Sequence, residues 1–155
     1  MDLARFSDHS LFDREVLEAQ LNSSAPIPAL KQALETLKEK LNQRFVQGEP
    51  IRNLVYGRAW AMDQIIATIW GLFEWQNAEQ IALIAVGGYG RGELLPHSDI
   101  DLLVLYPEAG LGDAERLLEQ FLTALWDLRL NVGHSVRSAN ECREQAAGDI
   151  TIMTN

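Results

Sequence analysis

The feature that most constrains this chain is a pair of apolar runs joined by a glycine turn and a short polar connection. The first run covers residues 81–86 and ends in two glycines. The second covers residues 100–106, and Asp99 and Asp101 stand at its beginning. Continuous apolar runs of this length between turn residues predict buried strands. The order strand, glycine turn, strand with paired carboxylates is typical of a site that holds phosphate groups and a divalent cation.

The two carboxylates are predicted to act together. Residues i and i+2 of a strand point to the same face, so Asp99 and Asp101 project together while Ile100 faces the core. Mg²⁺ prefers oxygen ligands and takes one or two carboxylates together with substrate phosphates. An isolated Asp-x-Asp is more often a solvated strand end or a turn cap. The glycine turn eleven residues upstream favours the metal, so we predict Asp99 and Asp101 as metal-binding, catalytic residues.

The glycine turn is predicted to bind the phosphates of a nucleotide. Gly87 and Gly88 can bring backbone N–H groups close to a triphosphate, although a plain strand-to-helix turn would use them too. Arg91 could hold a phosphate or pair with Glu93, and Ser98 could bond a phosphate or cap the strand. Neither a Gly-x-x-x-x-Gly-Lys-Ser/Thr loop nor a Gly-x-Gly-x-x-Gly run is present, which argues against a P-loop or a dinucleotide fold.

Charge and cysteine content limit the partners and the compartment. A formal net charge of −9 argues against binding to nucleic acid or to an anionic membrane. Cys142 is the one cysteine, so no intrachain disulfide can form and a reducing compartment is expected. The first eight residues are acidic and polar, unlike a signal peptide, and no apolar stretch reaches the ~20 residues of a membrane span. We therefore expect a soluble, cytoplasmic protein.

The apolar periodicity divides the chain into a helical part and a part with strands. We predict a helical N-terminal segment over residues 1–50 and a second domain over residues 51–155, which together give an α+β fold. The chain ends at Asn155 in a mixed apolar and polar segment without a stop signal, which predicts a domain truncated at its C-terminus. Predicted helices are 11–21, 28–47, 51–75, 113–128 and 140–147, the last with Asn140 as N-cap; predicted strands are 81–86, 100–106 and 130–137.

The central block resembles a known superfamily. Gly87-Gly88 followed by Asp99-Ile100-Asp101 is similar to the signature of polymerase-β-like nucleotidyltransferases. Residues 86–94, 98–103 and 133–137 resemble the N-terminal domain of the bifunctional PII uridylyltransferase/uridylyl-removing enzymes. The resemblance implies a small mixed sheet with packed helices and covers roughly residues 80–150. The helical region with Arg58 and Asp63 fits more loosely.

The resemblance also implies a reaction and its participants. Members of that family transfer UMP from UTP to a tyrosine hydroxyl of the PII nitrogen-signalling protein and release pyrophosphate. Asp99 and Asp101 would bind Mg²⁺, and Gly87 and Gly88 would seat the triphosphate. Uridylyl removal and glutamine sensing belong to further domains and are not expected in this chain.

Three points stay open at this stage. Another nucleotidyltransferase, which adenylylates a protein or a small molecule, would use the same turn and aspartate pair. A non-catalytic nucleotide-binding regulatory module is a third reading. Many superfamily members carry a third acidic residue on the next strand, where this chain has His134 and Ser135. Either two carboxylates suffice, or Asp149 or Glu141 contributes.

Overall fold

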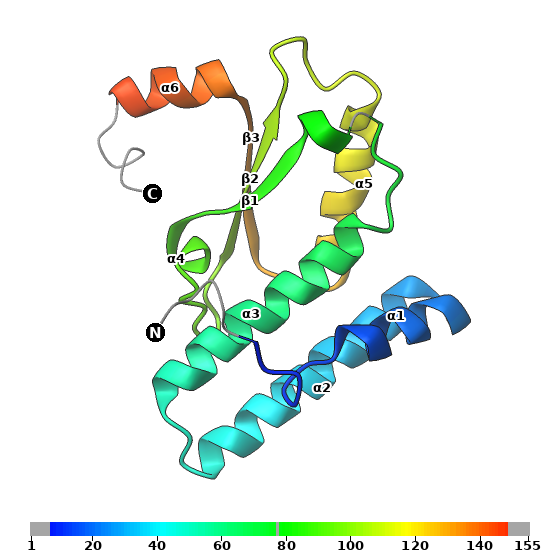
Figure 1. Ribbon diagram of the computed structural model, residues 1–155, viewed down its shortest axis with the longest axis vertical. Helices are drawn as coiled ribbons and strands as arrows, with labels where there is room; N and C mark the ends of the chain where they lie inside the picture. Colours follow the sequence, from blue (N-terminus) through cyan, green and yellow to red (C-terminus); the bar gives the residue numbers. More distant parts are fainter. Residues whose placement is uncertain (1–6, 77, 149–155) are drawn as a thin grey trace.

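The computed structural model describes residues 7–76 and 78–148 and shows helices packed on a small mixed sheet, which confirms the predicted α+β fold (Figure 1). Helices α1 to α3 lie together at one end of the molecule, and the sheet lies at the other (Figure 1). The elements are α1 (Arg14–Ser23), α2 (Pro26–Val46), α3 (Ile51–Trp70), η2 (Ala78–Gln80), β1 (Ala82–Ala85), α4 (Gly87–Gly90), β2 (Ile100–Tyr106), α5 (Ala114–Asp127), β3 (Val132–Ser138) and α6 (Ala139–Gly148).

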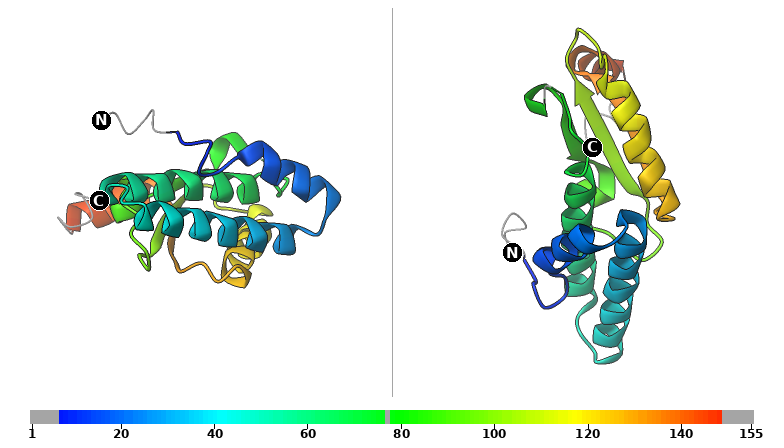
Figure 2. Two further views of the ribbon diagram at one scale, coloured as in Figure 1. Left: turned by 90° about the horizontal axis from the view of Figure 1, so that it is seen from below. Right: turned by 90° about the vertical axis from the view of Figure 1, so that its right-hand side faces the viewer.

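The sheet has the order β1-β2-β3, with β2 in the centre. β1 pairs with β2 antiparallel, whereas β3 pairs with β2 parallel after the chain has crossed over through α5. Along β2, Ile100, Leu102 and Val104 are buried, and Asp101 and Leu103 between them are half-buried. Helix α5 lies along one side of the sheet (Figure 2). Asp101 and its neighbours at alternate positions therefore occupy the sheet face opposite to the core.

Helix α3 connects the helical region with the sheet. Its apolar side chains belong to one cluster of buried residues that runs from Leu11 to Leu128. Ile65 and Ile69 on α3 and Phe121 and Leu125 on α5 are fully buried in this cluster. Because side chains of α3 share this core with side chains of α5, the apolar stripe of α3 is wide. None of the described helices is both long enough and apolar enough to cross a membrane.

Two predicted helix limits were wrong by three residues or more, and one predicted N-cap was wrong. α3 ends at Trp70 rather than at residue 75, and Trp75 folds back so that its ring stacks on Trp70 with 3.8 Å between centroids. The first helix begins at Arg14 because Asp13 accepts bonds from the first amides of α1. The N-cap of α6 is not Asn140.

Ser138 caps α6 instead, one residue before the helix begins. The amide of Glu141 donates to Ser138 Oγ (3.2 Å), and the amide of Ser138 donates to the Glu141 carboxylate (2.7 Å). This reciprocal pair is a capping box, in which serine is followed three residues later by glutamate. Asn140 lies inside the helix.

An ion pair ties the N-terminal segment to α2. Asp8 accepts two bonds from Arg44, at 2.5 and 3.2 Å, and further bonds from the Ser10 hydroxyl and the Leu11 amide. The Arg44 guanidinium, more than any other group, holds the pKa of Asp8 well below its usual range. Both side chains are 22% exposed, so solvent screens the pair only in part.

Asp8→Asn is expected to lower the free energy of unfolding by about 1–2 kcal/mol at pH 7, because a charged acceptor of several hydrogen bonds is lost. A depressed pKa stabilises the folded state above the unfolded value of 3.8, and this stabilisation is lost as the pH falls through the folded value. The difference between wild type and variant should therefore shrink below about pH 4. Urea unfolding at pH 7 and pH 3 measures it. Glu18→Gln, which breaks an exposed pair with Arg14, is the control and should cost at most about 0.5 kcal/mol.

Candidate functional site

The carboxylate of Asp101 lies between two glycines that come from different elements. A Cβ built on Gly133 would lie 2.7 Å from Asp101 Oδ1, and a Cβ built on Gly87 would lie 2.9 Å from Oδ2. Gly133 is the register partner of Asp101 across the parallel pair β2–β3, and Gly87 begins the turn after β1. The missing side chains leave room for this carboxylate at the end of the sheet. The carboxylate keeps solvent access there, since Asp101 is only half-buried.

Asp99 lies just before β2 and is exposed. Its carboxylate accepts a hydrogen bond from the Asn131 side chain, which comes from the segment between α5 and β3. The two residues before it, His97 and Ser98, close a turn that begins at Leu95, where the Ser98 amide donates to the Leu95 carbonyl (3.1 Å). His97 occupies a left-handed backbone conformation (φ 70°) directly after Pro96, as the third residue of a type II turn requires.

The glycine turn forms a single helical turn, α4, attached to both neighbouring strands. The Val86 amide donates to the Asp101 carbonyl (3.0 Å), which places the start of the turn beside Asp101. Gly87 has a positive φ of 62°, a conformation that glycine adopts without steric cost. Within the described part of the chain, the amides of residues 87–89 have no hydrogen-bond acceptor. Three unpaired N–H groups beside a carboxylate pair can bind phosphate oxygens.

The predicted phosphate ligands around the turn are placed differently. Arg91 forms an exposed pair with Glu93 (Nε to Oε2, 3.3 Å), which is one of its two predicted roles. The Arg91 guanidinium also lies close to the glycine turn, since its Nη2 atom is 3.8 Å from the position that a Cβ on Gly88 would take. Ser98 is half-buried in the loop that precedes Asp99, and its side chain has no partner among residues 7–76 and 78–148. The structure thus brings Gly87, Gly88, Arg91 and the two aspartates to one end of the sheet.

Glu141 is not brought to this end. Its carboxylate accepts bonds from the Ser138 amide and the Tyr106 hydroxyl, at the last residues of β3 and β2. The Ser138 amide and the Tyr106 hydroxyl lower the pKa of Glu141, which is consistent with an engaged carboxylate. Asp149 lies outside the described residues. In the part of the chain that the structure describes, no three acidic, histidine or cysteine residues group as a metal site would.

Three residues of this region were not singled out by sequence reasoning as parts of the site: Gly133, Asn131 and Tyr89. A glycine inside a strand pattern often marks the close approach of another group. Gly133 could therefore have been identified from the sequence. Asn131 carried none, because its approach to Asp99 depends on the pairing of β2 with β3. Tyr89 donates its hydroxyl to Asp63 of α3 at 2.5 Å, a contact between segments 26 residues apart.

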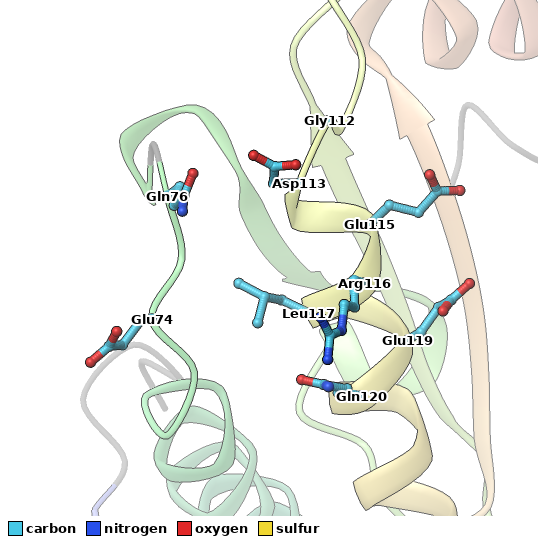
Figure 3. Close-up of a pocket in the computed structure, with 9 residues that line it drawn as sticks. All are labelled: Glu74, Gln76, Gly112, Asp113, Glu115, Arg116, Leu117, Glu119 and Gln120. Atoms are coloured by element: carbon cyan, nitrogen blue, oxygen red, sulfur yellow. The ribbon is translucent and has the colours of Figure 1, made fainter.

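A cavity of about 680 Å³ lies at the beginning of α5, and none of the candidate site residues lines it (Figure 3). Four carboxylates and one arginine line it, so its charge would repel a triphosphate. In Figure 3, Arg116, Leu117 and Gln120 of α5 lie across from the segment that follows α3. The complete lining is Glu74, Gln76, Gly112, Asp113, Glu115, Arg116, Leu117, Glu119 and Gln120.

Comparison with known proteins gives consistent matches. The profile of the nucleotidyltransferase domain family matches residues 66–147. The bifunctional uridylyltransferase/uridylyl-removing enzyme of Pseudomonas putida (strain W619) is 50% identical over 149 residues, which is 96% of this chain. The enzyme of the same description from Azotobacter vinelandii (strain DJ / ATCC BAA-1303) is 52% identical over the same length. The chain spans 17% of the length of these relatives. No solved structure matches it.

Proposed function

The chain belongs to the nucleotidyltransferase domain family, a family of enzymes, and from this membership we propose that it transfers UMP from UTP to a tyrosine hydroxyl of the PII nitrogen-regulatory protein. Pyrophosphate is the second product. The choice of UMP rests on the description of the relatives as uridylyltransferases. The choice of PII as acceptor rests on the resemblance of residues 86–94, 98–103 and 133–137 to that family. We place this reaction in the cytoplasm.

The observation that carries the proposal is the Asp101 carboxylate set between Gly87 and Gly133, next to three amides that have no acceptor among the described residues. The room around this carboxylate and its oxygen chemistry fit Mg²⁺, which binds proteins through few carboxylates and completes its shell with phosphate and water. Asp101 and Asp99 would hold it. When bound, Mg²⁺ stabilises charge on the phosphate oxygens and promotes attack by the hydroxyl.

The protein groups supply binding and orientation. The amides of residues 87–89 donate to the oxygens of the β- and γ-phosphates, and the glycines let the backbone approach them. Arg91 can exchange Glu93 for a phosphate at low cost, since an exposed ion pair contributes only about 0–1 kcal/mol. Asn131 orients the Asp99 carboxylate. The α-phosphorus is thereby held for attack by the acceptor hydroxyl, opposite the departing pyrophosphate.

Calorimetric titration of UTP and of ATP, each with Mg²⁺, into this chain tests the proposal. We expect Mg²⁺-dependent binding with preference for UTP, and its loss in the Asp99→Asn/Asp101→Asn double variant. The Asp113→Asn/Glu115→Gln variant removes the same charge at the cavity of Figure 3 and should bind like wild type. Preference for ATP would instead support an adenylylating enzyme. Binding without any need for Mg²⁺ or the aspartates would contradict the proposed site.

A further inference from the structure

A tyrosine within the glycine turn connects that turn to helix α3. Tyr89 is the third residue of α4 and is 4% exposed. Its hydroxyl donates to Asp63 Oδ1 at 2.5 Å. Asp63 lies on α3, in the stretch of the helix that reaches the sheet. Partial removal of the carboxylate from water raises the pKa of Asp63, and the bond from Tyr89 opposes that rise.

The backbone of the turn is attached to the sheet at both of its ends. The amides proposed to bind phosphate, those of residues 87–89, lie between these two attachments. At the start, the Val86 amide donates to the Asp101 carbonyl. At the end, a Cβ on Gly90 would lie 2.6 Å from the Ala85 carbonyl oxygen, so the chain folds back tightly onto β1. The Tyr89 side chain adds a third attachment, to an element outside the sheet. The direction of the amides between these points therefore depends on where Tyr89 is held.

The tyrosine ring belongs to the buried core, but there is open space beside its contact with Asp63. A cavity of about 290 Å³ borders the pair, lined by Asp63 and Tyr89 themselves and by apolar residues of α3, β1 and β2. A side chain beside such a space can shift when its polar contact is removed. A phenylalanine would bury nearly the same apolar surface, so the hydroxyl contributes direction rather than burial.

We propose that Tyr89 and Asp63 are positioning residues, which hold the amides of the glycine turn in the position and direction needed to bind phosphate beside Asp101. The role of these amides rests on the function proposed above. Neither side chain touches the nucleotide in this arrangement. The Tyr89 hydroxyl and the Asp63 carboxylate act through the backbone of residues 87–90.

Hydrogen exchange tests the positioning role without any ligand. The amides of Gly90, Gly92 and Glu93 are bonded to carbonyls of the same turn and report its order. In Tyr89→Phe we expect them to exchange about tenfold faster, whereas amides in α2 should be unchanged. Tyr106→Phe is the matched control, since it removes a tyrosine–carboxylate bond to Glu141 far from the turn. It should leave exchange in the turn unchanged.

Nucleotide affinity tests the consequence for binding. Tyr89→Phe should bind MgUTP about tenfold more weakly, with a change in melting temperature no larger than that of Tyr106→Phe. Asp63→Asn keeps an oxygen acceptor for the hydroxyl and should retain most of the affinity, whereas Asp63→Ala should match Tyr89→Phe. The double variant Asp63→Ala/Tyr89→Phe should be no worse than either single variant.

The outcomes separate the two proposals. Wild-type exchange in the turn of Tyr89→Phe would overturn the positioning role, and so would additive effects in the double variant. If exchange changes as expected but wild type binds no nucleotide, the positioning of the turn is supported and the proposed function fails. Weaker binding in Tyr106→Phe as well would show a general effect of losing a tyrosine bond and would also overturn the proposal.

Discussion

Replacing Asp101 by asparagine is expected to lower the rate of nucleotidyl transfer by about a thousandfold, because a metal-binding charge worth several kcal/mol in the transition state is lost. The amide has nearly the shape of the carboxylate, so it fits the same space beside Gly87 and Gly133. The free energy of unfolding should change by less than about 1 kcal/mol, since Asp101 is only half-buried and its side chain accepts no bond within the described residues.

Pyrophosphate release from UTP, with PII protein as acceptor, measures this effect. The chain spans 17% of its relatives, so the assay uses a chimera in which it replaces the matching segment of the A. vinelandii enzyme. Asp113→Asn in the same chimera is the control, because it removes one negative charge at the cavity on α5. A rate above a tenth of the wild-type rate in Asp101→Asn would exclude the proposed metal role for this carboxylate.

The strands and most helices of this fold could be predicted from apolar spacing, and the end of α3 shows where this spacing fails. β2 was predicted with the bounds that the structure has, because its apolar run is bounded by Asp99 on one side and Pro107 on the other. α3 was predicted too long, because Phe73 and Trp75 continue the apolar pattern after the helix has ended at Trp70. Both pack with Phe121 in the same core. Apolar spacing records which side chains are buried, not where the backbone leaves the helix.

The candidate site could be predicted where its residues are close in the sequence. Strand geometry predicts that Asp99 and Asp101 share a face; in the structure Asp99 directly precedes β2 and Ile100 between them is buried. Gly133 and Asp63 lie 32 and 38 residues from Asp101, and their approach depends on strand register and on the packing of α3. A single sequence shows neither the register of the strands nor the packing of α3. Ser138, in contrast, could have been identified as the helix cap from its spacing to Glu141.

The register partner of Asp101 offers the sharpest test of the site geometry. In Gly133→Ala, the new methyl would lie 2.7 Å from Asp101 Oδ1, closer than real Cβ contacts allow. On its other side the carboxylate lies close to Gly87, where Oδ2 is 2.9 Å from the position that a Cβ would take. Gly133 does not have a positive φ, so the backbone can accept alanine without strain. The substitution therefore acts on the carboxylate position alone.

We expect Gly133→Ala to lower nucleotidyl transfer by about a hundredfold, the usual consequence of misplacing a catalytic group by ~1 Å. Its free energy of unfolding should stay within about 1 kcal/mol of wild type, because alanine costs less backbone entropy than glycine in a strand and so offsets part of the steric strain. The same chimera and assay measure the rate, and urea unfolding measures stability. Gly148→Ala, where an added Cβ meets nothing within 4 Å, is the control and should leave the rate unchanged. Full activity in Gly133→Ala would mean that the reaction does not depend on Asp101 being held between the two glycines.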